Sequence, residues 1–134
     1  MNNKRANSTF HVPVLKDIVF SSLRVKPDGV YFDGTLGFGG HSKLIMEKFS
    51  NKGKLIGFDG DLDAIKYCES NLSSSCIIIN DSYSSFQKYL TEFNLNEFDG
   101  MLLDLGVSSY QIDNSEKGFS YNNNGPLDMR FNKN

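Results

Sequence analysis

The stretch "YFDGTLGFGGHSKLI", from Tyr31 to Ile45, carries the strongest indication of the fold. An apolar run ends in an acid, a glycine-rich segment follows, and the residues after it have helical character. A glycine-rich turn that leaves the first strand of a parallel sheet is where the backbone comes close to a bound ligand. Gly37, Gly39 and Gly40 would remove the Cβ atoms that otherwise hold a ligand away. The alternative is a tight turn that binds nothing.

The segments on either side of this stretch alternate between strand-like and helix-like patterns. Short apolar runs of buried-strand character are Val30–Asp33, Lys54–Asp59, Cys76–Asn80 and Phe98–Gly106. Helical stretches are expected at Lys43–Phe49, Asp63–Asn71 and Tyr83–Phe93, and from Pro13 through Leu23. Repeated strand–helix–strand units predict an α/β fold with a parallel sheet and right-handed crossovers.

Length and composition suit one small globular domain, because the chain has 134 residues of which 39% are hydrophobic. The 14 Lys and Arg against 16 Asp and Glu give no basic excess of the kind typical of nucleic-acid-binding proteins, although a local basic patch stays open. No signal-peptide core and no apolar run near the roughly 18 residues of a membrane span are present, so a soluble, cytoplasmic protein is expected. Cys68 and Cys76 fit neither a zinc pattern nor a disulfide framework.

The glycine-rich segment and a later acid indicate a nucleoside-containing ligand. Asp59 ends the second strand-like run about 20 residues after Gly39, a separation that suits a carboxylate accepting hydrogen bonds from ribose hydroxyls. As a dinucleotide fingerprint the match is imperfect, because Ser42 stands where the third glycine or alanine belongs.

Two further acids, Asp33 and Asp104, also end strand-like runs and are expected at the same edge of the sheet. S-adenosylmethionine is cationic, so carboxylates near it would compensate its charge, whereas beside a pyrophosphate they would repel it. The acids therefore favour S-adenosylmethionine over a dinucleotide. Each of them taken alone is more often the cap of a following turn.

Five blocks occur in order along the chain: "HVPVL" (His11–Leu15), "DGTLGFGGHS" (Asp33–Ser42), "FDGD" (Phe58–Asp61), "LLDLGVSS" (Leu102–Ser109) and "GFSYNNNGPLDMR" (Gly118–Arg130). Together they closely resemble the RsmH or MraW family, the bacterial 16S ribosomal RNA cytosine-N4 methyltransferases. The resemblance implies a class I, Rossmann-like methyltransferase that uses S-adenosylmethionine. Its target would be the exocyclic N4 of a cytidine in the decoding region of 16S ribosomal RNA, within the small ribosomal subunit.

By matching motifs, the resemblance implies cofactor contacts at Gly39, Gly40, His41, Asp59, Tyr83, Asp104 and Gln111. The family often carries Phe where Tyr83 stands, and either ring can stack on adenine. The base that accepts the proton is not identified by the sequence; the candidates are Asp104, Ser108 and Ser109, of which the two serines are more often turn-forming. No metal ligand is assigned.

Aromatic and basic residues near the end of the sequence have two interpretations. Phe119, Tyr121, Arg130 and Phe131 either stack on RNA bases or pack the protein, with packing favoured for Phe119.

The family builds a seven-stranded sheet with a helical substrate-binding insertion, and only about four strands can be read here. Residues 1–10 are expected to form a flexible arm, and residues 11–134 a partial methyltransferase domain, its cofactor-binding half, without the insertion and the C-terminal strands. Strand four would then be an exposed edge through which the chain could self-associate. Two alternatives stay open: a non-catalytic cofactor-binding module that needs a partner chain, and, more remotely, a dehydrogenase-like dinucleotide-binding domain.

Overall fold

Four parallel strands in the order β3-β2-β1-β4 form the centre of the computed structural model, which describes residues 15–131. The strands are β1 Val30–Asp33, β2 Lys54–Phe58, β3 Cys76–Ile79 and β4 Gly100–Leu102. The α/β class, the parallel sheet and the four strands are confirmed. The expected arm at residues 1–10, Pro13 and most of the His11–Leu15 block lie outside the described residues.

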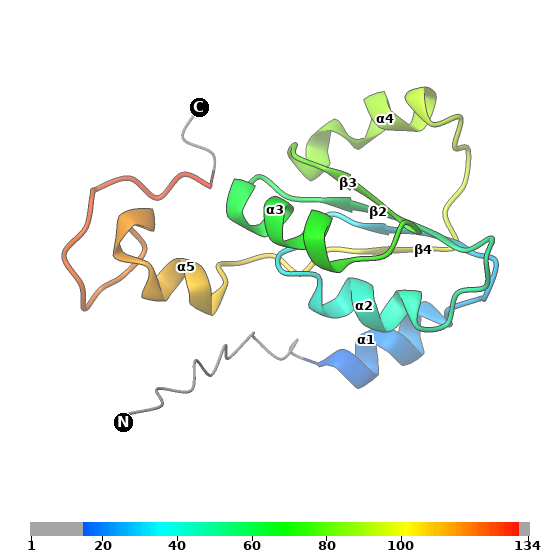
Figure 1. Ribbon diagram of the computed structural model, residues 1–134, viewed down its shortest axis with the longest axis horizontal. Helices are drawn as coiled ribbons and strands as arrows, with labels where there is room; N and C mark the ends of the chain where they lie inside the picture. The colour runs from blue at the N-terminus through cyan, green and yellow to red at the C-terminus, as the bar shows by residue number, and fades with distance from the viewer. Residues whose placement is uncertain (1–14, 132–134) are drawn as a thin grey trace.

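Helices cover both faces of this sheet (Figure 1). α1, α2 and α3 lie on one side of the sheet and α4 on the other, while α5 lies beyond the ends of the strands. The helices are α1 Lys16–Leu23, α2 Gly40–Met46, α3 Leu62–Asn71, η1 Tyr83–Ser85, α4 Phe86–Glu92, α5 Ser109–Asp113 and η2 Ser115–Lys117, where η1 and η2 are 3₁₀ turns. Because both faces are covered, the strands are apolar on both sides, as parallel sheets require.

Alternate residues of β1 and β2 pack into two separate hydrophobic cores, one on each face of the sheet. Tyr31 and Leu55, opposite each other in the register, pack with Ile45 of α2 and Ile65 of α3. Phe32 belongs to the second core, on the α4 side. The period of two along each strand thus assigns neighbouring residues to opposite layers.

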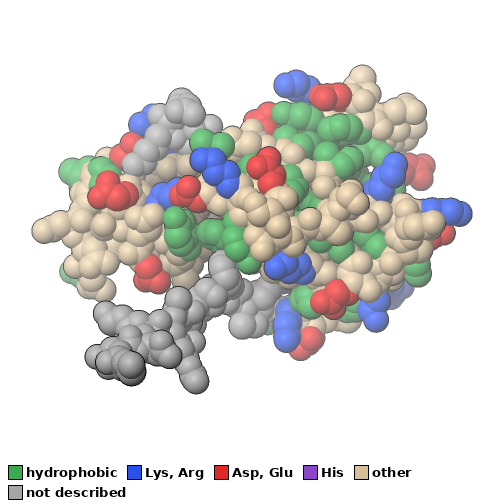
Figure 2. Space-filling view, viewed as in Figure 1, with side chains coloured by type: hydrophobic (Ala, Val, Ile, Leu, Met, Phe, Trp, Pro, Cys, Tyr) green, Lys and Arg blue, Asp and Glu red, His purple; other side chains and the backbone are tan. Residues whose placement is uncertain are grey.

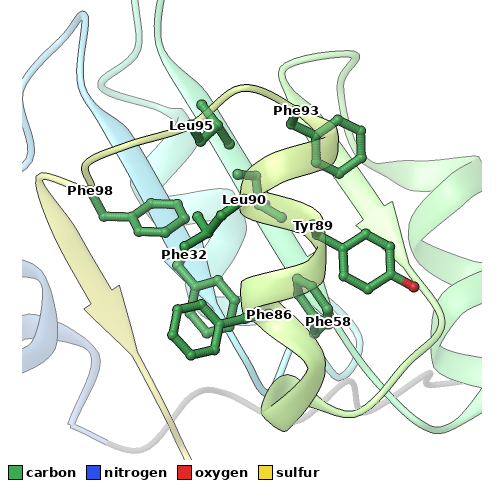
Figure 3. A pocket seen from close by; sticks show the side chains of 9 residues that line it. Phe32, Phe58, Phe86, Tyr89, Leu90, Phe93, Leu95 and Phe98 are labelled. Carbon is green, nitrogen blue, oxygen red and sulfur yellow. The ribbon is translucent and has the colours of Figure 1, made fainter.

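The core under α4 is rich in aromatic rings (Figure 3). Phe32 lies 5.3–5.8 Å, between ring centroids, from Phe58, Phe86 and Phe98, two of these contacts being edge-to-face. A cavity of about 10 Å³ remains among these side chains, room for at most one water molecule, and its apolar lining offers a water no partner. It is a gap in core packing and not a ligand site.

Three predicted boundaries are wrong in detail. The helix expected at Lys43–Phe49 is Gly40–Met46, because Gly39, with a φ of 76°, turns the chain straight into α2. The stretch predicted as one helix at Tyr83–Phe93 divides into η1 and α4, with Ser82 capping η1. The apolar run Phe98–Gly106 pairs only over Gly100–Leu102, since β1, its one neighbour in the described part of the sheet, is four residues long.

β4 forms one edge of the sheet within the described residues, as expected. Met101, Leu103, Leu105 and Val107, in and after this strand, are exposed. No helix in residues 15–131 is long and apolar enough to cross a membrane.

The two cysteines predict a simple chemical test of the fold. Cys68 and Cys76 are both buried and free, and burial raises the pKa of both thiols to about 12. The thiolate is the reactive form, so iodoacetamide should leave the native chain unmodified from pH 7 to 9, whereas the unfolded chain, with ordinary thiol pKa values of about 8.5, should be alkylated at both sites. Intact-mass spectrometry gives the count, and rapid alkylation of the native chain would contradict the buried placement.

Candidate functional site

The residues predicted to bind a cofactor come together at the carboxyl ends of the strands. Asp33 is the last residue of β1, Asp59 directly follows β2, and Asp104 lies two residues beyond β4. In a parallel sheet these ends share one edge, where α/β proteins bind their ligands. The glycine-rich loop, residues 34–39, leaves the same edge from β1 and leads into α2.

The conformation of the glycine-rich loop requires glycine at two positions. Gly37 and Gly39 have φ angles of 50° and 76°, in the left-handed region that other residues rarely adopt. The ideal position of a Cβ on Gly39 is 3.0 Å from the Leu72 side chain and 3.4 Å from the Cys68 sulfur. The Cys68 thiol also donates to the Gly37 carbonyl oxygen, at 3.2 Å. The loop therefore packs directly against residues at the end of α3.

Asp33 holds the loop from within. Its buried carboxylate accepts hydrogen bonds from the Ser42 hydroxyl at 2.7 Å and from the Thr35 N–H at 3.1 Å. Burial raises the pKa of this carboxyl, although the bonds from Ser42 and Thr35 act in the opposite direction. Because its oxygens face the loop, Asp33 stabilises the site without facing a ligand.

Asp59 keeps acceptor capacity for a ligand. One carboxylate oxygen accepts the Gly37 N–H at 2.7 Å and the other accepts the Asp61 N–H at 2.8 Å. Burial raises the pKa of this carboxyl, opposed by the two N–H donors and by the charge of Lys117. A carboxylate has about four lone-pair positions, so each oxygen can take a second donor. The partly buried carboxylate thus suits a pair of hydroxyls.

His41, in α2, and Asp104, after β4, lie next to each other at the carboxyl edge of the sheet. The His41 side chain is only 9% exposed, and its Nε2 lies 3.4 Å from a carboxylate oxygen of Asp104, which is 54% exposed. This Nε2 is buried without a hydrogen-bond partner among the described residues. The Asp104 N–H donates to the Thr35 hydroxyl at 2.7 Å, which fixes the end of β4 to the loop. A buried polar atom without a partner is the feature that a bound polar ligand would satisfy.

Tyr83 begins η1 and lies over the start of the glycine-rich loop. The ideal Cβ position on Gly34 is 2.4 Å from the Leu103 side chain and 2.9 Å from the Tyr83 Cβ. Glycine at this position therefore allows Tyr83 to approach the end of β1. Its ring is partly exposed, as a stacking surface must be.

Gln111 uses both ends of its amide within the protein. Its side-chain oxygen accepts the Ser108 N–H at 2.9 Å, and its backbone N–H donates to the Ser108 hydroxyl at 3.2 Å. These two reciprocal bonds form a capping box at the start of α5. Its side-chain nitrogen donates to Asp61 at 2.8 Å. Ser108 therefore caps α5, in line with the turn-forming interpretation of this residue, and Ser109 is the first residue of the helix.

A buried group around Asp61 was missed by the sequence analysis. Asp61 accepts hydrogen bonds from Gln111 and from Lys117, the latter at 2.7 Å, and caps α3 through the Asp63 N–H. α5 also contacts the glycine-rich loop, because Phe38 packs edge-to-face against Tyr110 at 5.1 Å. The Ser-x-x-Gln pattern of the capping box was the one local signal for this arrangement.

The aromatic and basic residues near the end of the sequence divide between the two interpretations. Phe119 and Phe131 stack on each other at 5.6 Å, and the Cβ of Phe131 lies near Gly60, beside Asp59. Arg130 pairs with Asp128 at 2.9 Å, and Tyr121 is fully exposed. Packing accounts for the two stacked rings and leaves Tyr121 without a structural role.

The architecture is that of a parallel α/β domain of Rossmann type, with a glycine-rich loop and acids at the carboxyl edge of its sheet. The model of the MraW methylase family matches residues 8–134. The chain belongs to the MraW methylase family.

Curated relatives agree with this assignment. "Ribosomal RNA small subunit methyltransferase H" of Mycoplasmopsis pulmonis is 50% identical over 125 residues, covering 91% of this chain and 42% of that protein. The proteins of the same name from Clostridium botulinum and Mycoplasmoides gallisepticum are 46% and 45% identical, covering 92% and 96% of this chain and 40% and 42% of their own lengths. The chain thus spans about two fifths of the length of the curated relatives it matches.

The left-handed conformation at Gly39 predicts a cost for any side chain there. We expect Gly39→Ala to lower the free energy of unfolding by at least about 1 kcal/mol, from the left-handed φ alone. Crowding of the new methyl against Leu72 adds to this loss. Urea denaturation followed by circular dichroism measures it.

Gly60→Ala is the matched control, because among the described residues a Cβ there meets only the Phe131 Cβ, at an ordinary 3.5 Å. Its unfolding free energy should stay within about 0.5 kcal/mol of the parent chain. Equal stability of both variants would contradict the described loop conformation.

Proposed function

We propose that this chain forms the S-adenosylmethionine-binding half of an RNA methyltransferase. The reaction is N4-methylation of a cytidine in the decoding region of 16S ribosomal RNA. Membership of the MraW methylase family and the names of the curated relatives support the reaction class. The single observation that supports a ligand at this edge is the buried His41 Nε2, which has no hydrogen-bond partner among the described residues.

The chemistry of the edge residues fits this cofactor. Asp59 would accept the ribose hydroxyls, since both of its oxygens keep a free lone pair. Tyr83 would stack on the adenine, and the backbone of Gly39 and Gly40 would allow close approach. His41 and Asp104 complete the proposed direct contacts, and Asp104 is the most exposed of the three acids at the strand ends. Gln111, also predicted as a contact, is buried with its amide bound to Ser108 and Asp61, so we propose that it acts through Asp61.

When bound, the cofactor supplies a methyl group on a positively charged sulfonium. The carboxylates of Asp59 and Asp104 favour a cation at this edge through charge attraction. The amino lone pair of cytosine is delocalised into the ring, so the site must align the nitrogen and remove a proton. Asp104 is the best-placed acceptor, because it is exposed beside His41, whereas the Ser108 hydroxyl already accepts the Gln111 N–H.

The RNA partner would be the 16S ribosomal RNA of the small subunit, and we accordingly assign the protein to the cytoplasm, where ribosomes are. Acidic and basic side chains are scattered over the face shown in Figure 2, without an extended basic patch in its described part. The exposed Tyr121 is the side chain best suited to stack on a base. Self-association through the β4 edge, with Met101 and Leu103 exposed there, is a secondary proposal.

Calorimetric titration with S-adenosylhomocysteine tests the proposed cofactor site. The parent chain should bind, and Asp59→Ala should weaken binding at least about tenfold, because hydrogen bonds to a charged group contribute about 1.5–3 kcal/mol each. Asp17→Ala, an exposed acid on α1, is the control and should bind like the parent. Equal binding by all three chains would contradict the assignment of Asp59.

Methyl transfer is tested separately, with unmethylated small ribosomal subunits and mass spectrometry of the digested nucleosides. N4-methylcytidine formed by the chain would support the full proposal. Binding without transfer would favour the alternative of a non-catalytic module that needs a partner chain. Preference for NADH over S-adenosylhomocysteine would favour the dinucleotide alternative.

A further inference from the structure

A buried ion pair lies directly beside the proposed ribose-binding acid. The Lys117 ammonium is 2.7 Å from a carboxylate oxygen of Asp61 and 2.8 Å from one of Asp63. The Lys117 side chain is 14% exposed and that of Asp61 is 1% exposed. Gln111 donates to the other oxygen of Asp61 at 2.8 Å, so the buried carboxylate is fully partnered.

This ion pair is connected to Asp59 through a single backbone group. The Asp61 N–H donates to one oxygen of Asp59 at 2.8 Å, while the Gly37 N–H donates to the other at 2.7 Å. Only Gly60 separates the two acids in the chain. The side chain of Asp61, held by Lys117, therefore fixes the N–H that orients the Asp59 carboxylate.

The charge of Lys117 also acts on this edge directly. Burial raises the pKa of Asp59, and the positive charge of Lys117 is one of the influences that oppose it. For Lys117 itself burial would lower the pKa, but the hydrogen bonds to Asp61 and Asp63 outweigh burial and the pKa is raised. The ammonium thus stays charged at neutral pH, where it favours ionised carboxylates around it.

We propose that Lys117 is a positioning residue for nucleoside binding. Acting through Asp61, it holds the Asp59 carboxylate in the orientation that accepts the two ribose hydroxyls. This inference rests on the proposed cofactor site. In this role Lys117 would not contact the ligand itself; it joins η2, which follows α5, to Asp61 at the start of α3.

The test compares two ligands, S-adenosylhomocysteine and its 2′,3′-dideoxy analogue, by calorimetry. Lys117→Gln should weaken binding of S-adenosylhomocysteine at least about tenfold and leave the dideoxy analogue nearly unaffected, because the lost contact is with the hydroxyls. Lys117→Arg keeps the charge and should recover most of the hydroxyl preference. Equal weakening for both ligands would overturn the inference, since a merely structural role does not distinguish them.

Lys26→Gln is the matched control, because Lys26 also pairs with a carboxylate, that of Asp99 at 2.7 Å, but is exposed and lies at the other end of β1. It should bind both ligands like the parent chain. If Lys117→Gln does not fold, Lys117→Arg decides: a folded Lys117→Arg without hydroxyl preference overturns the inference, and one that retains it supports the inference.

Amide hydrogen exchange separates this inference from the proposed function. In Lys117→Gln the amides of Gly37 and Asp61 should exchange faster, while that of Thr35, which donates to Asp33, should not change. A parent chain that binds no S-adenosylhomocysteine contradicts the proposed function, whereas the exchange result still decides whether Lys117 positions Asp59. Unchanged exchange at Gly37 and Asp61 would overturn that role.

Discussion

The hydrogen bonds accepted by the Asp59 carboxylate join parts of the chain that are far apart in sequence. One oxygen binds the N–H of Gly37 in the glycine-rich loop, and the other binds that of Asp61 at the start of α3. Asp61 is bound in turn by Gln111 and Lys117, from α5 and η2. Bonds to a charged acceptor contribute about 1.5–3 kcal/mol each, roughly twice the value for neutral pairs. The loop conformation therefore depends on the segment that follows β4 as well as on its own glycines.

The sheet could be predicted from the sequence because buried parallel strands leave a plain pattern of short apolar runs between helical stretches. The lengths of the strands could not be predicted, because a strand ends where its hydrogen-bonded pairing ends and not where its apolar run ends. The run Phe98–Gly106 is apolar almost throughout, yet only Gly100–Leu102 pairs, alongside the short β1. Likewise the start of α2 is set by the left-handed Gly39 and by the bond between Ser42 and Asp33, which no periodicity records.

The location of the candidate site could be predicted from the sequence, but the hydrogen bonds and ion pairs that join its residues could not. The ends of parallel strands meet at one edge, so Asp59 and Asp104 could be assigned to it from spacing alone. The pair of Asp61 and Lys117 could not, since its members are 56 residues apart and Asp61 by itself reads as a helix cap. The capping box of Ser108 and Gln111, by contrast, follows a known local pattern, because its two residues are three apart in the chain.

A count of acids overstates the negative charge that a cationic ligand would meet at this edge. Asp33 is buried, its pKa is raised by that burial, and its oxygens accept from Thr35 and Ser42. Thr35, whose N–H it binds, in turn accepts the Asp104 N–H through its hydroxyl. The attraction for a cation would thus come from Asp59 and Asp104, whereas Asp33 helps to position Asp104 through Thr35. An acid at the end of a strand can therefore serve a binding site as an internal support, a role that sequence spacing does not distinguish from ligand contact.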